Sequence, residues 1–194
     1  MSKIKVIALY GKAGAGKDAL LQTMMSMSKP EEAHEIISCT TRPPRENEID
    51  HINYHFITVD DFTKMVLNGE MLEATEFRDW WYGTPISSLD PDCINIGVFN
   101  PAGIAAIYED PRLDVFPIYV IASDKTRLLR QLNRENDPDV AEIIRRYQTD
   151  EKDFRHFECD YDIAHYTIRN EDSLEKSAYS LLQVAQLFFK DKVN

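Results

Sequence analysis

Continuous apolar runs alternate with amphipathic segments along this 194-residue chain, and the two patterns predict different elements. Residues 3–10 and 115–122 are almost entirely apolar or β-branched, which is typical of strands buried on both faces of a sheet. Shorter apolar or alternating runs predict further strands. The expected strands are Lys3–Tyr10, Glu35–Thr40, Tyr54–Thr58, Met71–Phe77, Cys93–Phe99, Val115–Ala122 and Asp162–Ile168.

Helical spacing of apolar residues fills most of the segments between these strands. Start and stop signals agree: Pro101 is a favourable first helical residue, Asp124 can cap a helix, and Gly69 stands where a helix would end. The last expected helix has a wide apolar surface that suits either core packing or a dimer seam, so both a monomer and a homodimer are open. The expected helices are Ala19–Ser28, Val59–Asn68, Ala102–Tyr108, Lys125–Arg134, Val140–Phe157 and Leu174–Lys190.

Strands and helices alternate at both ends of the chain, which predicts an α/β fold with a parallel sheet and crossover helices. Residues 35–91 are richer in short strands, so we expect them to form an inserted subdomain. The core would then consist of residues 1–34 and 92–194 within one domain of ordinary size.

The chain carries 33 acidic and 22 basic residues, and its net charge of −11 argues against general binding to nucleic acid or to an anionic membrane. A small phosphate substrate is compatible with this charge, because local Arg and Lys residues can create a positive pocket. The three cysteines are widely spaced, and the first residues have no apolar leader segment, so we expect a cytoplasmic protein with reduced thiols. The five histidines show no metal-ligand spacing and are expected to be structural.

Residues 11–18 (GKAGAGKD) match the phosphate-binding loop pattern G-x-x-x-x-G-K, and they lie between an expected strand and an expected helix. The glycines let successive backbone N–H groups point at one phosphate, and the following helix adds its positive dipole end. Lys17 supplies a point charge for the β- and γ-phosphates. The residues expected to bind the nucleotide here are Gly11, Ala13, Gly14, Ala15, Gly16, Lys17, Asp18 and Ala19.

Asp18 is the irregular residue of this loop, because the pattern normally ends in Ser or Thr, whose hydroxyl binds Mg²⁺. A carboxylate can also bind Mg²⁺, directly or through water, but without a metal it would repel phosphate. Asp18 is therefore either an alternative magnesium ligand or the mark of a loop that binds nucleotide poorly. The intact remainder of the loop favours the first interpretation.

A second group of polar residues follows in the expected subdomain. Arg42 and Arg45 lie three residues apart beside Pro43 and Pro44, an arrangement that suits a fixed fork for a phosphate. Glu73 can accept hydrogen bonds from the N1 and N2 hydrogens of guanine, and Ser or Thr hydroxyls can donate to O6. Each residue alone would be an ordinary loop residue, whereas the set indicates a nucleotide site.

The runs SCTTRPPRENEID, NYHF, NGEMLEATEF and YGTP resemble the guanylate kinase family in the family's order, and YDIAHYTIRN near the end is also similar. The resemblance covers nearly the whole chain. It implies an ATP- and Mg²⁺-dependent enzyme of the P-loop NTPase type, with a monophosphate-binding subdomain and a small lid at about residues 134–146. It implies Ser38, Glu73 and Thr84 for guanine, Arg42, Arg45, Tyr54 and Tyr82 for the GMP phosphate, Asn170 for ATP, and Arg134, Arg145 and Arg146 for the lid.

Two positions depart from the family pattern. Val98-Phe99-Asn100 stands where the family usually carries two acidic residues, one supporting magnesium and one touching the nucleobase. Asn100 can still form a hydrogen bond with a base, whereas Val98 cannot support a metal. We therefore expect Asp18 to take over the lost magnesium role.

The sequence thus predicts phosphoryl transfer from ATP to GMP or dGMP. One alternative is a kinase of broader or different base specificity, because the Lys-Asp loop ending also resembles that of some phage-type deoxynucleoside monophosphate kinases. The other alternative is a non-catalytic guanylate-kinase-like binding module, which the irregular residues Asp18 and Val98 favour. The expected catalytic residues are Lys17, Arg42, Arg134 and Arg146.

Overall fold

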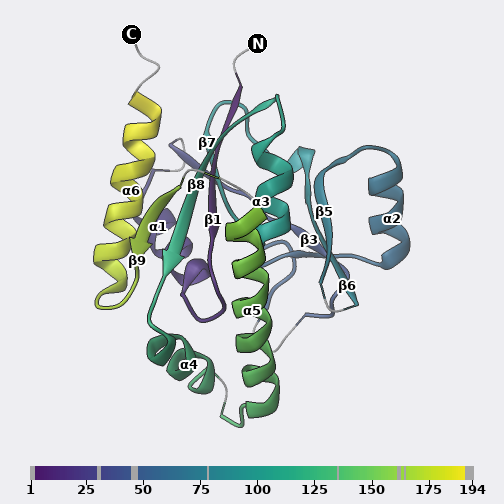
Figure 1. The fold of residues 1–194 in the computed structure, drawn as a ribbon. Helices are drawn as coiled ribbons and strands as arrows, with labels where there is room; N and C mark the ends of the chain where they lie inside the picture. Colours follow the sequence, from purple (N-terminus) through teal and green to yellow (C-terminus); the bar gives the residue numbers. More distant parts are fainter. Residues whose placement is uncertain are drawn as a thin grey trace.

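The computed structural model describes residues 3–29, 32–44, 48–77, 79–134, 136–160, 163 and 165–190. These residues form a parallel five-stranded sheet with helices on both faces and a separate four-stranded sheet (Figure 1). The α/β class expected from the sequence is confirmed. Within the described ranges, no helix is long and apolar enough to cross a membrane.

The five-stranded sheet has the order β2-β7-β1-β8-β9, and each pair of neighbouring strands is parallel. Side chains of the central strand β1 alternate between two cores: Ile7 and Leu9 enter one, and Val6 and Ala8 enter the other. Burial on both faces explains why this segment reads as a continuous apolar run. The strands are β1 (Ile4–Tyr10), β2 (Ala33–Glu35), β7 (Ile94–Val98), β8 (Leu113–Ile121) and β9 (Tyr166–Arg169).

Two layers of helices cover this sheet (Figure 1). Leu20 of α1 packs with Leu181 of α6 in the first core, and Ile104 of α3 packs with Phe154 of α5 in the second. Leu181 is fully buried, so α6 uses its apolar surface for core packing, although Leu187 stays 64% exposed. The helices are α1 (Lys17–Met27), α3 (Pro101–Tyr108), α4 (Asp124–Leu132), α5 (Val140–Asp160) and α6 (Leu174–Lys190).

The second sheet is mixed, with the order β4-β3-β6-β5, and lies within the expected subdomain. Strand β3 runs parallel to β4 and antiparallel to β6, which in turn pairs antiparallel with β5. Phe62 of α2 is buried against this sheet beside Trp81. The elements are β3 (Cys39–Thr40), β4 (His55–Phe56), α2 (Val59–Leu67), β5 (Met71–Phe77), β6 (Trp80–Pro85) and the 3₁₀ turn η1 (Ile86–Ser88).

Several details differ from the elements expected from the sequence. The last strand runs over Tyr166–Arg169, whereas the expected range began at Asp162, which lies outside the described residues. The expected strand Glu35–Thr40 is divided, because its two ends belong to different sheets. Strand β6 was not predicted, since Gly83 and Pro85 interrupt its pattern; a Cβ at Gly83 would lie 2.8 Å from the carbonyl oxygen of Glu73 on the neighbouring strand. The cap of α4 is Ser123 rather than Asp124.

The parallel strands end at one edge of the sheet, which is where open α/β sheets bind ligands. The phosphate-binding loop follows β1 at this edge, and residues 98–100 follow β7. Ser123 follows β8, and Asn170 follows β9. Segments that are far apart in the sequence therefore meet around one site.

Candidate functional site

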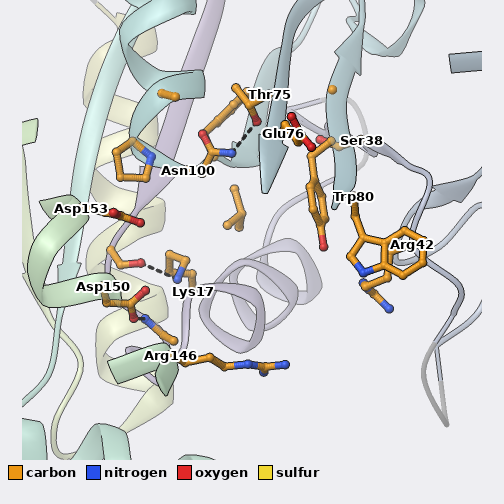
Figure 2. Close-up of a pocket in the computed structure, with 18 of the residues that line it drawn as sticks. Lys17, Ser38, Arg42, Thr75, Glu76, Trp80, Asn100, Arg146, Asp150 and Asp153 are labelled. Atoms are coloured by element: carbon orange, nitrogen blue, oxygen red, sulfur yellow. Dashed lines mark hydrogen bonds between the residues drawn. The ribbon is translucent and has the colours of Figure 1, made fainter. Parts of the chain in front are cut away.

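A cavity of about 830 Å³ is lined both by the carboxyl edge of the central sheet and by the subdomain. Figure 2 shows Lys17 and Asp150 on one side and Ser38 and Trp80 on the other. The expected site residues that line it are Gly11, Ala13, Lys17, Asp18, Ser38, Arg42, Tyr54, Glu73, Tyr82, Asn100, Arg145 and Arg146. Arg45 lies outside the described residues, and those that do not line the cavity are Gly14, Ala15, Gly16, Ala19, Thr84, Arg134 and Asn170.

Glycines of the loop permit two close approaches. Gly16 precedes α1 with a left-handed φ of 86°, and a Cβ there would lie 2.6 Å from the side-chain nitrogen of Asn170. At Gly11, a Cβ would lie 2.2 Å from the carbonyl oxygen of Val120 on β8. The loop therefore fits against its neighbours only because these two side chains are absent.

Lys17 folds back over the loop that it ends. Its Nζ donates a hydrogen bond to the carbonyl oxygen of Gly11 at 2.7 Å (Figure 2). Burial lowers the pKa of the Lys17 ammonium, whereas the nearby carboxylates of Asp18 and Asp150 raise it. A phosphate in the loop would offer this ammonium a charged acceptor, which makes a stronger hydrogen bond than a carbonyl.

A carboxylate from α5 already contacts the loop. Oδ2 of Asp150 accepts a hydrogen bond from the backbone N–H of Ala13 at 2.6 Å. The same carboxylate lies 3.6 Å from the guanidinium of Arg127, which donates to the carbonyl oxygen of Ala13 at 3.0 Å. Loop N–H groups of this kind bind phosphate oxygens. Asp150 therefore holds a donor for which a phosphate would compete.

Two arginines of α4 support the loop, although the sequence did not indicate them as site residues. Arg127, whose side chain is 3% exposed, also pairs with Glu151 at 3.3 Å. Arg130 donates to the carbonyl oxygens of Ala15 and Asn170 at 3.2 and 2.9 Å. The only sequence signal was their spacing of three residues, which places them on one face of the helix.

Asn170 completes the support of the loop from the end of β9. Its side-chain nitrogen donates to the carbonyl oxygen of Ala15 at 2.9 Å. Its side-chain oxygen is buried and accepts no hydrogen bond from the described part of the chain. A buried acceptor without a partner is costly, and Asn170 is 1% exposed and does not line the cavity.

On the subdomain side of the cavity, the lining residues Ser38 and Glu73 are joined through the fully buried Thr84. Thr84 Oγ1 donates to Glu73 Oε1 at 2.8 Å and lies 3.3 Å from Ser38 Oγ. Burial raises the pKa of Glu73 to about 7, although the hydrogen bonds from Thr84 act against this rise. The Glu73 carboxyl group therefore titrates near neutral pH.

Asn100 joins the core to the subdomain. Its side-chain oxygen accepts from the N–H of Gly103 and caps α3, while its side-chain nitrogen donates to Thr75 Oγ1 on β5 at 2.7 Å (Figure 2). Both ends of the amide are thus occupied, although the residue lines the cavity next to Glu73.

Arg42 is buried, with 8% of its surface exposed, and lines the same cavity. Its guanidinium pairs with Glu48, with one nitrogen-to-oxygen distance of 2.9 Å and another of 3.0 Å. It also lies 5.7 Å from the ring centre of Tyr54, which packs edge-on against Tyr82. Burial raises the pKa of the Tyr54 phenol, so its hydroxyl stays protonated and can donate. The Nε of Arg42 has no partner among the described residues.

The expected lid arginines lie in two different environments. Arg145 and Arg146 of α5 both pair with Glu142, at 2.7 and 2.9 Å, and line the cavity. Arg134 follows α4, is exposed and does not line the cavity. Residues 140–146 are already part of α5, so the expected lid range is partly helical.

Asp18 and Val98 both line the cavity, and Asp18 is exposed. No described residue forms a hydrogen bond or an ion pair with the Asp18 carboxylate. Mg²⁺ is commonly bound by one or two carboxylates together with waters and substrate phosphates. Asp18 beside the loop therefore fits such a site, and Val98 contributes no ligand.

The chain matches the model of a known protein family and individual proteins of the same name. A family model described as "Guanylate kinase" matches residues 3–187. The guanylate kinase of Thermosynechococcus vestitus is 40% identical over 81 residues, which cover 42% of this chain and only 41% of that protein. The guanylate kinase of Campylobacter jejuni strain RM1221 is 26% identical over 189 residues, covering 95% of this chain and 89% of its own.

A solved structure agrees in fold. The crystal structure of guanylate kinase from Anaplasma phagocytophilum matches with a TM-score of 0.68 and covers 96% of this chain and 87% of that one. The sequence identity in this match is 21%, so it bears on the fold alone.

The contact between Asp150 and the loop leads to a first prediction. Asp150→Asn removes the negative charge of the carboxylate that accepts from the Ala13 N–H. A nucleoside triphosphate should therefore bind about tenfold more tightly, a gain of about 1.4 kcal/mol. Isothermal titration calorimetry with a non-hydrolysable triphosphate analogue measures the change.

Asp124→Asn is the matched control. Asp124 also pairs with Arg127, at 3.0 Å, but accepts no hydrogen bond from the loop. Its substitution should leave the affinity within about twofold, because the Asp124 side chain is 63% exposed and lies on the solvent side of Arg127 rather than on the loop. Equal affinities in wild type and Asp150→Asn would show that this carboxylate does not compete with phosphate.

Proposed function

The chain belongs to the guanylate kinase family, and from this premise we propose that it transfers the γ-phosphoryl group of ATP to GMP or dGMP. The observation that carries the proposal is one cavity lined both by the loop with Lys17 and by the buried carboxyl of Glu73. A phosphate-binding loop and a group suited to reading guanine thus lie around the same space. The products are ADP and GDP or dGDP.

Phosphoryl transfer requires mainly positioning and neutralisation of charge. Lys17 and the loop N–H groups hold the donor phosphates. The N–H of Ala13 joins them once a phosphate has displaced the carboxylate of Asp150. Asn170 is assigned to the donor nucleotide on the resemblance, and its hydrogen bond to Ala15 supports the loop that would hold the phosphates. Asp18 would hold the Mg²⁺ that the family typically uses with ATP, and a bound Mg²⁺ neutralises phosphate charge.

The acceptor nucleotide occupies the subdomain side. An ionised Glu73 accepts from the N1 and N2 hydrogens of guanine, and the hydroxyl of Ser38 is a donor for O6. The buried hydroxyl of Thr84 donates to Glu73, so Thr84 acts by holding this carboxylate in place. Arg42 has five N–H donors, so it can keep Glu48 on one edge and bind the acceptor phosphate with its unpaired Nε. The pair with Glu48 then serves to fix the plane of the guanidinium.

Tyr54 and Tyr82 add hydroxyl groups near Arg42, and Arg45 is assigned to the same phosphate on the resemblance alone. Arg146, like Arg145, already lines the cavity. Arg134 would reach it only through closure of the predicted lid at residues 134–146. Closure of the lid and of the subdomain at residues 35–91 would exclude water, so that ATP is not hydrolysed.

An assay of ADP release with GMP, dGMP, AMP, dTMP, CMP and UMP tests the proposal. We expect activity with GMP or dGMP alone, because Glu73 accepts hydrogen bonds and adenine offers no N1 hydrogen to it. Activity with other bases would indicate the kinase of broader specificity. Binding without turnover of any monophosphate would indicate the non-catalytic module, and Lys17→Ala serves as the background control.

The pKa of Glu73 predicts how GMP affinity depends on pH. Because this pKa is raised to about 7, the carboxyl is mostly protonated at pH 6 and mostly ionised at pH 8. Guanine requires the ionised form, so the affinity for GMP should rise about tenfold over this range. Fluorescence or calorimetric titration at several pH values measures it.

Glu73→Gln isolates the contribution of the carboxyl group. The GMP phosphate itself titrates near pH 6, but it does so equally in both proteins. The variant should bind GMP more weakly and lose the tenfold dependence. The assignment of Glu73 to guanine is wrong if the variant keeps the wild-type pH profile.

The position of Asp18 predicts the magnesium requirement. Asp18→Ala removes the carboxylate beside the loop, so the Mg²⁺ concentration for half-maximal activity should rise about tenfold. Asp18→Ser supplies the hydroxyl that the loop pattern normally carries and should stay close to wild type. An unchanged requirement in Asp18→Ala would exclude Asp18 as the magnesium residue.

A further inference from the structure

The turn before β4 brings together three side chains that the proposed phosphoryl transfer does not use. Asp50, His51 and His55 each offer one donor atom, and these atoms all lie within 4.8 Å of one another. His51 Nδ1 lies 2.7 Å from His55 Nδ1, and His51 Nε2 lies 3.4 Å from Asp50 Oδ2. Among the described residues, no other such group of three His, Cys, Asp or Glu side chains was found.

The backbone of the turn positions these groups. His51 has a left-handed φ of 64°, which is unfavourable for a residue other than glycine, and its N–H donates to the carbonyl oxygen of Tyr54 at 2.9 Å. Asp50 Oδ1 accepts from the N–H groups of His51 and Phe56, both at 3.0 Å. These bonds leave Oδ2 beside Nε2 of His51, whereas Nδ1 of His51 faces His55, so the exposed carboxylate must rotate about its side chain to share an ion with the two Nδ1 atoms. Strained residues of this kind often occur at ligand-binding sites.

The chemistry of the three groups suits a transition metal. Two neutral imidazoles whose nitrogens face each other at 2.7 Å can share only one proton, whereas a cation between them uses both lone pairs. Zn²⁺ is bound by two histidines and a carboxylate with water in the fourth position, and tetrahedral geometry separates its donors by about 3.3 Å. Asp50 and His51 are exposed and His55 is half-buried, so small rotations of their side chains can reach this spacing.

We propose that Asp50, His51 and His55 bind one Zn²⁺ ion per chain, with water as the remaining ligand. The site lies outside the cavity, since none of the three residues lines it. Tyr54, however, lies between His51 and His55 in the sequence, and its ring contacts Arg42 and Tyr82. Zinc would therefore cross-link the turn that carries one of the residues assigned to the acceptor phosphate. This last consequence rests on the proposed function, whereas zinc binding does not.

Competition with a chromophoric zinc chelator, using reduced metal-free protein, measures the affinity. Wild type should take up one equivalent of Zn²⁺. His51→Asn removes one imidazole but keeps a residue type that tolerates the left-handed backbone, and His55→Gln removes the other imidazole. Each variant should bind Zn²⁺ at least about tenfold more weakly, a loss of about 1.4 kcal/mol.

His165→Gln is the control, because His165 is an exposed histidine beside Tyr10 at the central sheet. It should keep the wild-type zinc affinity. Zinc should also raise the unfolding midpoint of wild type and of His165→Gln but not that of His51→Asn. The proposal is wrong if wild type takes no zinc from the chelator, or if all variants bind it equally. Neither readout requires kinase activity, so failure of the proposed function leaves this test unchanged.

Discussion

Burial of β1 on both faces is the constraint on which the rest of the structure depends. The chain leaves this strand at Tyr10 and must enter α1 at Lys17, because Leu20 and Met24 of that helix pack on the same sheet. Only a tight turn can join two buried elements over so few residues. Gly11 and Gly16 allow it, and the turn in turn directs backbone N–H groups toward the carboxyl edge of the sheet. The same packing that stabilises the core therefore shapes the loop at which we propose that phosphate binds.

Carboxylates hold the groups that would bind phosphate. Asp150 accepts from the loop N–H of Ala13, Glu48 pairs with Arg42, and Glu142 pairs with both Arg145 and Arg146. Leaving a half-buried cation unpaired costs free energy, so these ion pairs stabilise the ligand-free state. On the proposed function, a nucleotide phosphate would exchange one anionic partner for another instead of filling an empty positive pocket. Discrimination then depends on whether the ligand matches the geometry of the carboxylate that it replaces.

Elements that depend on a local residue pattern could be predicted from the sequence, whereas contacts between distant segments could not. Strand β1 and the loop were visible because apolar runs and glycine spacing are local signals. The contact of Asp150 with Ala13 was not, because it joins α5 to the loop across 137 residues. Strand β6 was missed because its pairing with β5, rather than its composition, makes it a strand. His51 and His55 showed no ligand spacing, since they meet only through the left-handed backbone at His51.

The excess of acidic residues around the cavity bears on the proposed role of Asp18. Seven acidic residues but only four basic residues line the described cavity, and two phosphorylated nucleotides would add further negative charge. Glu73 relieves part of this excess, because its raised pKa allows it to be neutral near pH 7. The remainder cannot be balanced by Lys17 and the arginines alone, since several of these are already paired. A divalent cation at Asp18 would bring positive charge to the loop that we propose for the donor phosphates, and this would allow a carboxylate to replace the usual hydroxyl at this position.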